Sequence, residues 1–279
     1  MPNPSNVIAL PNGELPGLGI AATAAPGTRV EGSRNEVWLC QAYDASMGGH
    51  MLYVKPGITQ RAMMVEALAA QVAQCLRLPC PAPFLVVVKP HHIGRIKSDT
   101  TLLAFGCEQA GTRSLARPVH NVEIMLQLLK KLHHSEMLAM FDEWVGNSVR
   151  GPGDILFDPE GSAAIIDHEG AMQDLSKPDC AVTNWLATKI IERTDEKEHV
   201  ALLKALRARA AAAHRVQLKA VPSGVQYALD GVKIYTRLLN FLSERLVHLD
   251  HLLSSRVLPD QQYLTEESHP NDPHRTADV

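Results

Sequence analysis

Long apolar runs are absent from the 279-residue chain, since no segment approaches about eighteen consecutive apolar residues. We therefore expect no membrane span. The first residues carry no basic stretch followed by an apolar run, so we expect no secretory signal and a cytoplasmic protein. Only five cysteines occur, and none forms a CxxC pair, which argues against a zinc site or a disulfide framework and favours reduced thiols.

A strong charge of one sign is also lacking. The 27 Lys and Arg residues nearly balance 30 Asp and Glu residues, which gives a formal net charge of -3. This balance excludes broad electrostatic attraction to nucleic acids or membranes. The basic stretch around Ala210–Ala213 could meet RNA or DNA locally, but such a stripe is more often a solvated helix face, so nucleic acid is not the expected partner. Aromatic residues make up only 5%, yet 46% of the chain is hydrophobic, which is ample for a folded core.

Hydrophobic periodicity changes along the chain from strands to helices. Period-two and short apolar runs predict strands in the first part, and apolar residues at helical spacing predict helices in the second. The predicted strands are 36–42, 51–55, 84–88, 102–105, 154–157 and 163–166. The predicted helices are 60–77, 122–133, 135–144 with Ser135 as its cap, and most of 180–258 with breaks near Pro222 and Asp230.

This order favours an α+β protein with two unlike lobes, because alternating strand–helix units do not continue. Proline-rich residues 1–28 are expected to be an extended segment, and 29–110 a small strand-rich N-lobe. Residues 111–258 would form a mainly helical C-lobe that contains one hairpin, and 259–279 a flexible tail. Trp144 and Trp185 are expected to pack in the C-lobe. A cleft between unlike lobes is a natural nucleotide site.

Lys55 ends a predicted strand, and Glu66 lies on the helix that follows it. The ammonium of Lys55 could point toward the phosphates of a nucleotide, with the carboxylate of Glu66 orienting it. The alternative is an exposed lysine and a solvated glutamate. Gly32 and Ser33, just before the first predicted strand, are candidates for a roof over the phosphates. Gly17-Leu18-Gly19 lies too far upstream for that role.

Asp154 and Asp167 flank the predicted hairpin at 154–166, so they should lie together at its mouth. Two carboxylates at this place could hold Mg²⁺ against ATP, because Mg²⁺ prefers oxygen ligands. The alternative is that Asp154 caps a loop and Asp167 pairs with an arginine. The adjacent histidines His91-His92 and His133-His134 are expected to be surface or loop residues, because neighbouring side chains do not easily converge on one metal.

Together these segments resemble the HipA-family kinases, which share a fold plan with phosphatidylinositol kinases and protein kinases. The resemblance covers about residues 30–190. It rests on Tyr53-Val54-Lys55, on Glu66-Ala67-Leu68-Ala69, on Phe141-Asp142-Glu143-Trp144-Val145-Gly146-Asn147 and on Ile166-Asp167-His168. It implies a kinase-like fold in which Lys55 contacts the phosphates of ATP, Glu66 supports Lys55, and Asp167 binds Mg²⁺.

The departures from the family pattern concern the catalytic loop. The family reads Asn-x-Asp-Arg-His-x-x-Asn, so its catalytic aspartate falls on Val149, which cannot accept a proton. Arg150 is kept, and the metal-binding asparagine falls on Asp154. After Asp167-His168 the expected glycine is Glu169. Asp142, Asn147 and Arg150 are therefore the candidate catalytic residues, with a supporting role expected for Asp142.

Two functions follow from this resemblance. The first is an ATP–Mg²⁺-dependent kinase that transfers a phosphoryl group, or conceivably a nucleotidyl group, to a protein or small hydroxyl acceptor. The second is a pseudokinase that binds nucleotide and acts as an interaction module, which Val149 favours. A toxin or a toxin regulator of the HipA type is a third reading, for which the sequence offers only the family association.

Overall fold

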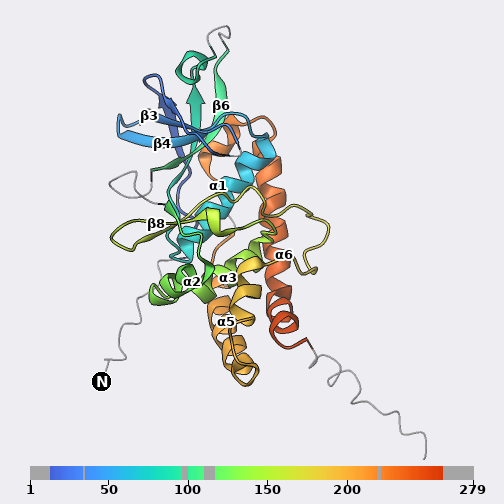
Figure 1. The fold of residues 1–279 in the computed structure, drawn as a ribbon. Helices are drawn as coiled ribbons and strands as arrows, with labels where there is room; N and C mark the ends of the chain where they lie inside the picture. Colours follow the sequence, from blue (N-terminus) through green and yellow to red (C-terminus); the bar gives the residue numbers. More distant parts are fainter. Residues whose placement is uncertain (1–12, 34, 96–99, 110–116, 219–220, 260–279) are drawn as a thin grey trace, which may run out of the picture.

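The structure is a computed structural model and describes residues 13–33, 35–95, 100–109, 117–218 and 221–259. It is a mixed α+β protein with strands in its N-terminal region and mostly helices in its C-terminal region (Figure 1). The predicted α+β class is therefore confirmed. The tail predicted at 259–279 lies outside the described residues, except for Pro259. None of the helices in the described ranges is both long and apolar enough to cross a membrane.

The N-terminal region is built on one sheet of six strands. These strands are β1 (Gly19–Thr23), β2 (Thr28–Arg29), β3 (Trp38–Asp44), β4 (Gly49–Lys55), β5 (Pro83–Val88) and β6 (Leu102–Glu108). Their order is β1-β5-β6-β4-β3-β2, and β1 also pairs with β3, so five of the strands close into a ring. Alternate residues of β5 face opposite sides: Val86 packs inside the ring with Val54, whereas Leu85 packs toward the helical core.

Two of these strands were not predicted. Residues 1–28 were expected to form an extended segment, and within it β1 pairs in parallel with β5 and antiparallel with β3. Its sequence, Gly-Ile-Ala-Ala-Thr, has little of the β-branched alternation that identifies a strand. Pairing with two neighbours, rather than local propensity, makes it a strand. Residues 1–12 of that segment lie outside the described residues.

A histidine ties the β3–β4 hairpin to the end of β6. His50 Nε2 lies 3.1 Å from Asp44 Oδ2, and Nδ1 lies 3.0 Å from Glu108 Oε1. These hydrogen bonds, first to Glu108 and then to Asp44, raise the pKa of His50 above its usual value of 6.5. The imidazolium is therefore the form that this network stabilises.

The raised pKa of His50 predicts how stability depends on pH. The folded state holds the proton more tightly than the unfolded chain does, so the stabilisation is complete below pH 6.5 and is lost as the pH rises through the folded pKa. Urea unfolding from pH 5.5 to 8.5 should show this loss in the wild type. His50→Gln should show a smaller loss over the same range, and identical slopes for both proteins would contradict the assignment.

The helices that build the C-terminal region are α2 (Val122–Lys131), α3 (Ser135–Val145), α4 (Trp185–Ile191), α5 (His199–Ala213) and α6 (Gly231–Val257), whereas α1 (Gln60–Cys75) lies against the sheet. The breaks predicted near Pro222 and Asp230 are confirmed. The prediction that Ser135 caps α3 is wrong: His134 holds the cap position, and the hydroxyl of Ser135 donates to Glu136 instead.

Helix α6 runs alongside both regions (Figure 1). Near its start, the hydroxyl of Tyr235 donates to Gln71 Oε1 on α1 at 2.6 Å. Further along, the carbonyl of Leu242 accepts from Trp144 Nε1 on α3 at 3.0 Å. Trp144 is fully buried and Trp185 is partly buried against the same core, as the sequence predicts. One helix thus fixes the positions of both segments that carry candidate site residues.

The predicted hairpin is confirmed as β8 (Ile155–Phe157) and β9 (Ala163–Ile165), and a short strand that was not predicted, β7 (Arg117–Pro118), pairs with β8. A turn closes the hairpin where the amide of Ser162 donates to Asp158 Oδ1 at 2.7 Å. The amide of Ile165 donates to the carbonyl of Pro79, 2.8 Å away, which anchors the hairpin to the chain that follows α1.

Candidate active site

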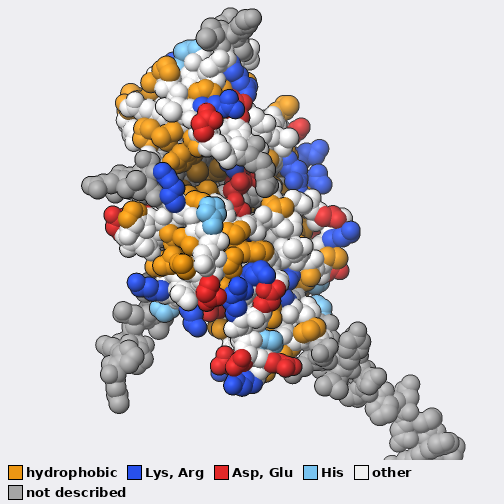
Figure 2. All heavy atoms as spheres, viewed as in Figure 1, with side chains coloured by type: hydrophobic (Ala, Val, Ile, Leu, Met, Phe, Trp, Pro, Cys, Tyr) orange, Lys and Arg blue, Asp and Glu red, His pale blue; other side chains and the backbone are white. Residues whose placement is uncertain are grey.

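A cavity of about 660 Å³ lies between the strands of the N-terminal region and the β8–β9 hairpin. Hydrophobic side chains surround the hollow that Figure 2 shows between these regions. Val30, Val37, Tyr53, Phe105, Leu156 and Ile165 line it together with the polar Lys55, Glu66 and Asp167. Such a volume, with apolar walls and a few convergent polar groups, is typical of small-molecule sites.

Lys55, Glu66 and Asp167 meet at one side of this cavity. Lys55 Nζ lies 2.5 Å from Glu66 Oε1 and 2.9 Å from Asp167 Oδ1. The Glu66 side chain is only 1% exposed and that of Lys55 13%, so the alternative of an exposed lysine beside a solvated glutamate is excluded. Burial would lower the pKa of Lys55, but the two carboxylates outweigh it and raise that pKa, so the ammonium stays charged.

The backbone at Asp167 and His168 is held in place by Glu66. The second carboxylate oxygen of Glu66 accepts from the amide of His168 at 2.8 Å. Asp167 has a φ of +59°, a left-handed conformation that aspartate tolerates better than most residues. Asp167 pairs with Lys55, whereas the alternative reading of the sequence expected an arginine as its partner.

Asp142 and Arg150 form a buried ion pair behind the cavity. Arg150 Nε donates to both oxygens of Asp142, at 2.8 and 2.7 Å, and each side chain is 1% exposed. Burial raises the pKa of Asp142 to about 6, against the lowering effect of Arg150. Neither residue lines the cavity. This placement favours the supporting role predicted for Asp142 over a role at the reacting atoms.

Arg150 also fixes the segment that carries Asp167. It donates to the carbonyl of Ile166 at 3.1 Å, and its Nη2 lies 3.0 Å from His168 Nδ1. Because a guanidinium only donates, His168 Nδ1 is the acceptor, and Nε2 carries the hydrogen toward Cys80 Sγ at 3.3 Å. Burial, then the charge of Arg150, lowers the pKa of His168 well below 6.5, so this ring is neutral.

Val149 stands where the resemblance expects a catalytic aspartate, and the residue is 51% exposed. Its amide donates to Asn147 Oδ1 at 3.3 Å, while Asn147 itself is buried beside Asp142. A Cβ added to Gly170 would lie 1.8 Å from Val149 Cγ2. The loop of Asn147 and Val149 is therefore packed directly on the segment that follows Asp167.

Asp154 and Asp167 both lie at the open end of the hairpin, as predicted: the amide of Ile166 donates to the carbonyl of Asp154 at 3.0 Å. Asp154 Oδ2 also accepts from the amide of Gly151 at 2.8 Å, so the loop-capping contact is present as well. Burial raises the pKa of Asp154.

In the described part of the chain, three acids lie close enough together to share a metal ion. They are Glu66, Asp167 and Glu169, whose ligand atoms lie within 4.8 Å of one another. Oxygen donors of this kind fit Mg²⁺, although Asp154 is not in the group. The histidine pairs contribute no ligand to it. In the sequence, Glu169 stands out only as a departure from the family's glycine.

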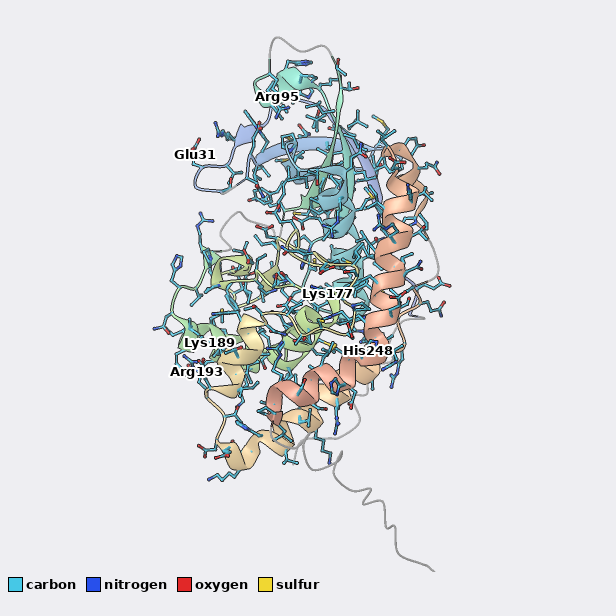
Figure 3. The ribbon with its side chains drawn as sticks, turned by 90° about the vertical axis from the view of Figure 1, so that its right-hand side faces the viewer. Glu31, Arg95, Lys177, Lys189, Arg193 and His248 are labelled. Atoms are coloured by element: carbon cyan, nitrogen blue, oxygen red, sulfur yellow. The ribbon has the colours of Figure 1, made fainter. Side chains whose placement is uncertain are left out.

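Gly32 and Ser33, the predicted roof, lie in the loop between β2 and β3 and line the cavity. The amide of Val30 donates to the carbonyl of Val37 at 2.9 Å, which closes the loop, and Gly32 adopts a φ of +77° that favours glycine. Figure 3 shows Glu31 of this loop at the gap between the two regions. Gly17-Leu18-Gly19 leads into β1 and does not line the cavity.

The family profile of HipA-like kinases matches residues 27–220, which include the loop, the Lys55–Glu66 pair and the whole hairpin. The chain belongs to the HipA-like kinase family. No curated protein matches it.

Among solved structures, this HipA-like kinase is similar to the Helicobacter pylori proinflammatory kinase CtkA, with a TM-score of 0.53 and 13% identity over 85% of this chain and 97% of that one. The open conformation of CtTel1 also matches, with a TM-score of 0.30 and 12% identity over 82% of this chain and 12% of that one. The likeness to CtkA shows a shared kinase fold.

Proposed function

We propose that this HipA-like kinase binds ATP with Mg²⁺ in the cavity between two lobes and transfers the γ-phosphoryl group to a hydroxyl of a protein or small molecule. The observation that carries the proposal is the Lys55–Glu66–Asp167 cluster on the wall of a cavity of about 660 Å³. Membership of the HipA-like kinase family supports a kinase-like function.

Each part of the site has a role in this proposal. The apolar walls, with Val30 and Val37 on one side and Leu156 on the other, would hold the base of the nucleotide. Lys55 is held by Glu66 with its ammonium in the cavity, where it would bind phosphate oxygens as a charge-assisted donor. Asp167 would hold Mg²⁺, which would neutralise the charge that develops on the phosphates. Asp142 and Arg150 would position the Asp167 segment from behind.

The second function, a pseudokinase, is favoured by Val149. Its isopropyl group has no lone pair and can neither orient an acceptor hydroxyl nor take its proton. Loss of a general base typically costs about 10²–10⁴-fold, so weak transfer would survive it. Calorimetry with ATP and Mg²⁺, followed by measurement of ATP turnover, tests both functions. Binding without turnover would support the pseudokinase, and no binding would overturn the nucleotide site itself.

Asp167→Asn is expected to abolish most of the dependence of ATP affinity on Mg²⁺. The asparagine side chain lacks the negative charge that would face the metal, while its oxygen can still accept from Lys55. Calorimetric titrations of ATP with Mg²⁺ and with excess chelator measure this dependence. Equal ATP affinity of the wild type in both conditions would show that Asp167 has no metal role.

A further inference from the structure

Asn35 and Glu169 join the two sides of the cavity. Asn35 follows the roof residues Gly32 and Ser33, and Glu169 follows Asp167 and His168. Asn35 Nδ2 donates to Glu169 Oε2 at 2.8 Å, between residues 134 positions apart in the sequence. Neither residue lines the cavity, although Ser33 and His168 do. The pair therefore lies next to the cavity and connects the two segments that line it.

Both ends of this hydrogen bond are anchored. On the roof side, the hydroxyl of Ser33 donates to the carbonyl of Asn35 at 2.6 Å. On the other side, the amide of His168 is held by Glu66. Gly170, just after Glu169, packs against Val149 so closely that an added Cβ would clash. A contact between two held segments restrains their separation, which a contact between two loose loops would not do.

The carboxylate of Glu169 lies close to two other acids of the site. Lys55 pairs with Glu66 and Asp167, and an oxygen of Glu169 lies within 4.8 Å of ligand oxygens of both acids. The hydrogen bond from Asn35 gives the carboxylate of Glu169 a donor on the roof loop, across from the segment that carries Asp167. A hydrogen bond to a charged acceptor is stronger than one between neutral groups.

We propose that Asn35 and Glu169 form a latch that holds the roof loop over the bound nucleotide and slows its dissociation. The proposal rests on the proposed function, because it requires a nucleotide in the cavity. Both are positioning residues: they act on the roof loop and not on the reacting atoms. The resemblance places glycine at position 169 in other members, which cannot accept such a bond through a side chain.

Stopped-flow displacement of a fluorescent ATP analogue by excess ATP, with Mg²⁺ present, tests the latch. Asn35→Ala and Glu169→Ala are each expected to speed dissociation by about ten-fold. The double variant should be no faster than either single one, because both remove the same bond. Glu169→Gln keeps an acceptor oxygen and should lie nearer the wild type than Glu169→Ala does. Glu160→Ala, an exposed glutamate of the β8–β9 turn, is the matched control.

The outcomes separate the latch from the proposed function. If the wild type binds no nucleotide, both are overturned. If it binds but Asn35→Ala dissociates at the wild-type rate, or if the two single effects multiply in the double variant, only the latch is overturned. If Glu169→Gln is as fast as Glu169→Ala while Asn35→Ala is unchanged, the charge of Glu169 acts on the metal and not on the roof. Equal melting temperatures of all variants show that a general loss of stability is not the cause.

Discussion

If the proposed kinase function holds, Val149→Asp is expected to raise phosphoryl transfer or ATP hydrolysis by about ten-fold or more, because it would supply the proton acceptor that the family pattern has at this position. Val149 is 51% exposed, so a carboxylate at this position stays hydrated and pays little desolvation free energy. It would stand beside Asn147 and above Gly170, on the segment that carries Asp167.

The arrangement of charges around position 149 determines how large this gain is. Arg150 already neutralises Asp142, so the new carboxylate would add to the negative charge of Asp154 and Asp167. Asp154→Asn in the same protein restores the asparagine of the family pattern and removes that repulsion, so the double variant should turn over at least as fast as Val149→Asp.

Val149→Asn is the matched control, because it has nearly the same shape as aspartate and accepts no proton. Steady-state ATP hydrolysis, with and without acceptor proteins, measures all the variants. The hypothesis of a missing base fails if the wild type already turns over at about 1–100 per second and Val149→Asp leaves that rate unchanged. It also fails if asparagine raises the rate as much as aspartate does.

Lys55→Met is expected to weaken ATP binding by about ten-fold or more and to destabilise the fold. The sequence alone predicts little loss of stability, since a lysine at the end of a strand could be at the surface. In the structure, however, Lys55 is the partner of Glu66, whose carboxylate is 1% exposed. Removing one member of a buried ion pair typically costs about 3–5 kcal/mol. Urea unfolding and calorimetry with ATP measure the two effects.

Lys55→Met combined with Glu66→Gln separates stability from binding. The glutamine side chain carries no charge that the loss of Lys55 would leave unpaired. Its oxygen can still accept from the backbone amide of His168. The double variant should therefore regain most of the lost stability while ATP binding stays weak. Wild-type affinity for ATP in this double variant would refute the phosphate role of Lys55.

The sequence by itself determined the elements with a strong local pattern. Helix α1, the hairpin of β8 and β9 and the long helix α6 follow from apolar periodicity and from turn residues, which act over a few positions. The family pattern also singled out Lys55, Glu66 and Asp167, and the structure brings these three together. Local chemistry was sufficient for these elements because each repeats a spacing that one helix turn or one hairpin enforces.

Only the tertiary structure decided the features that depend on distant partners. Strand β1 has weak local propensity and exists because β3 and β5 pair with it. The sequence favours a supporting role for Asp142, but only the fold shows that Arg150 Nε donates to both of its oxygens and that it does not line the cavity. The bond between Asn35 and Glu169 joins two loops that no short-range pattern connects. Such contacts cost the entropy of closing long loops, and the packing of the whole chain, not any single segment, supplies the free energy that offsets that cost.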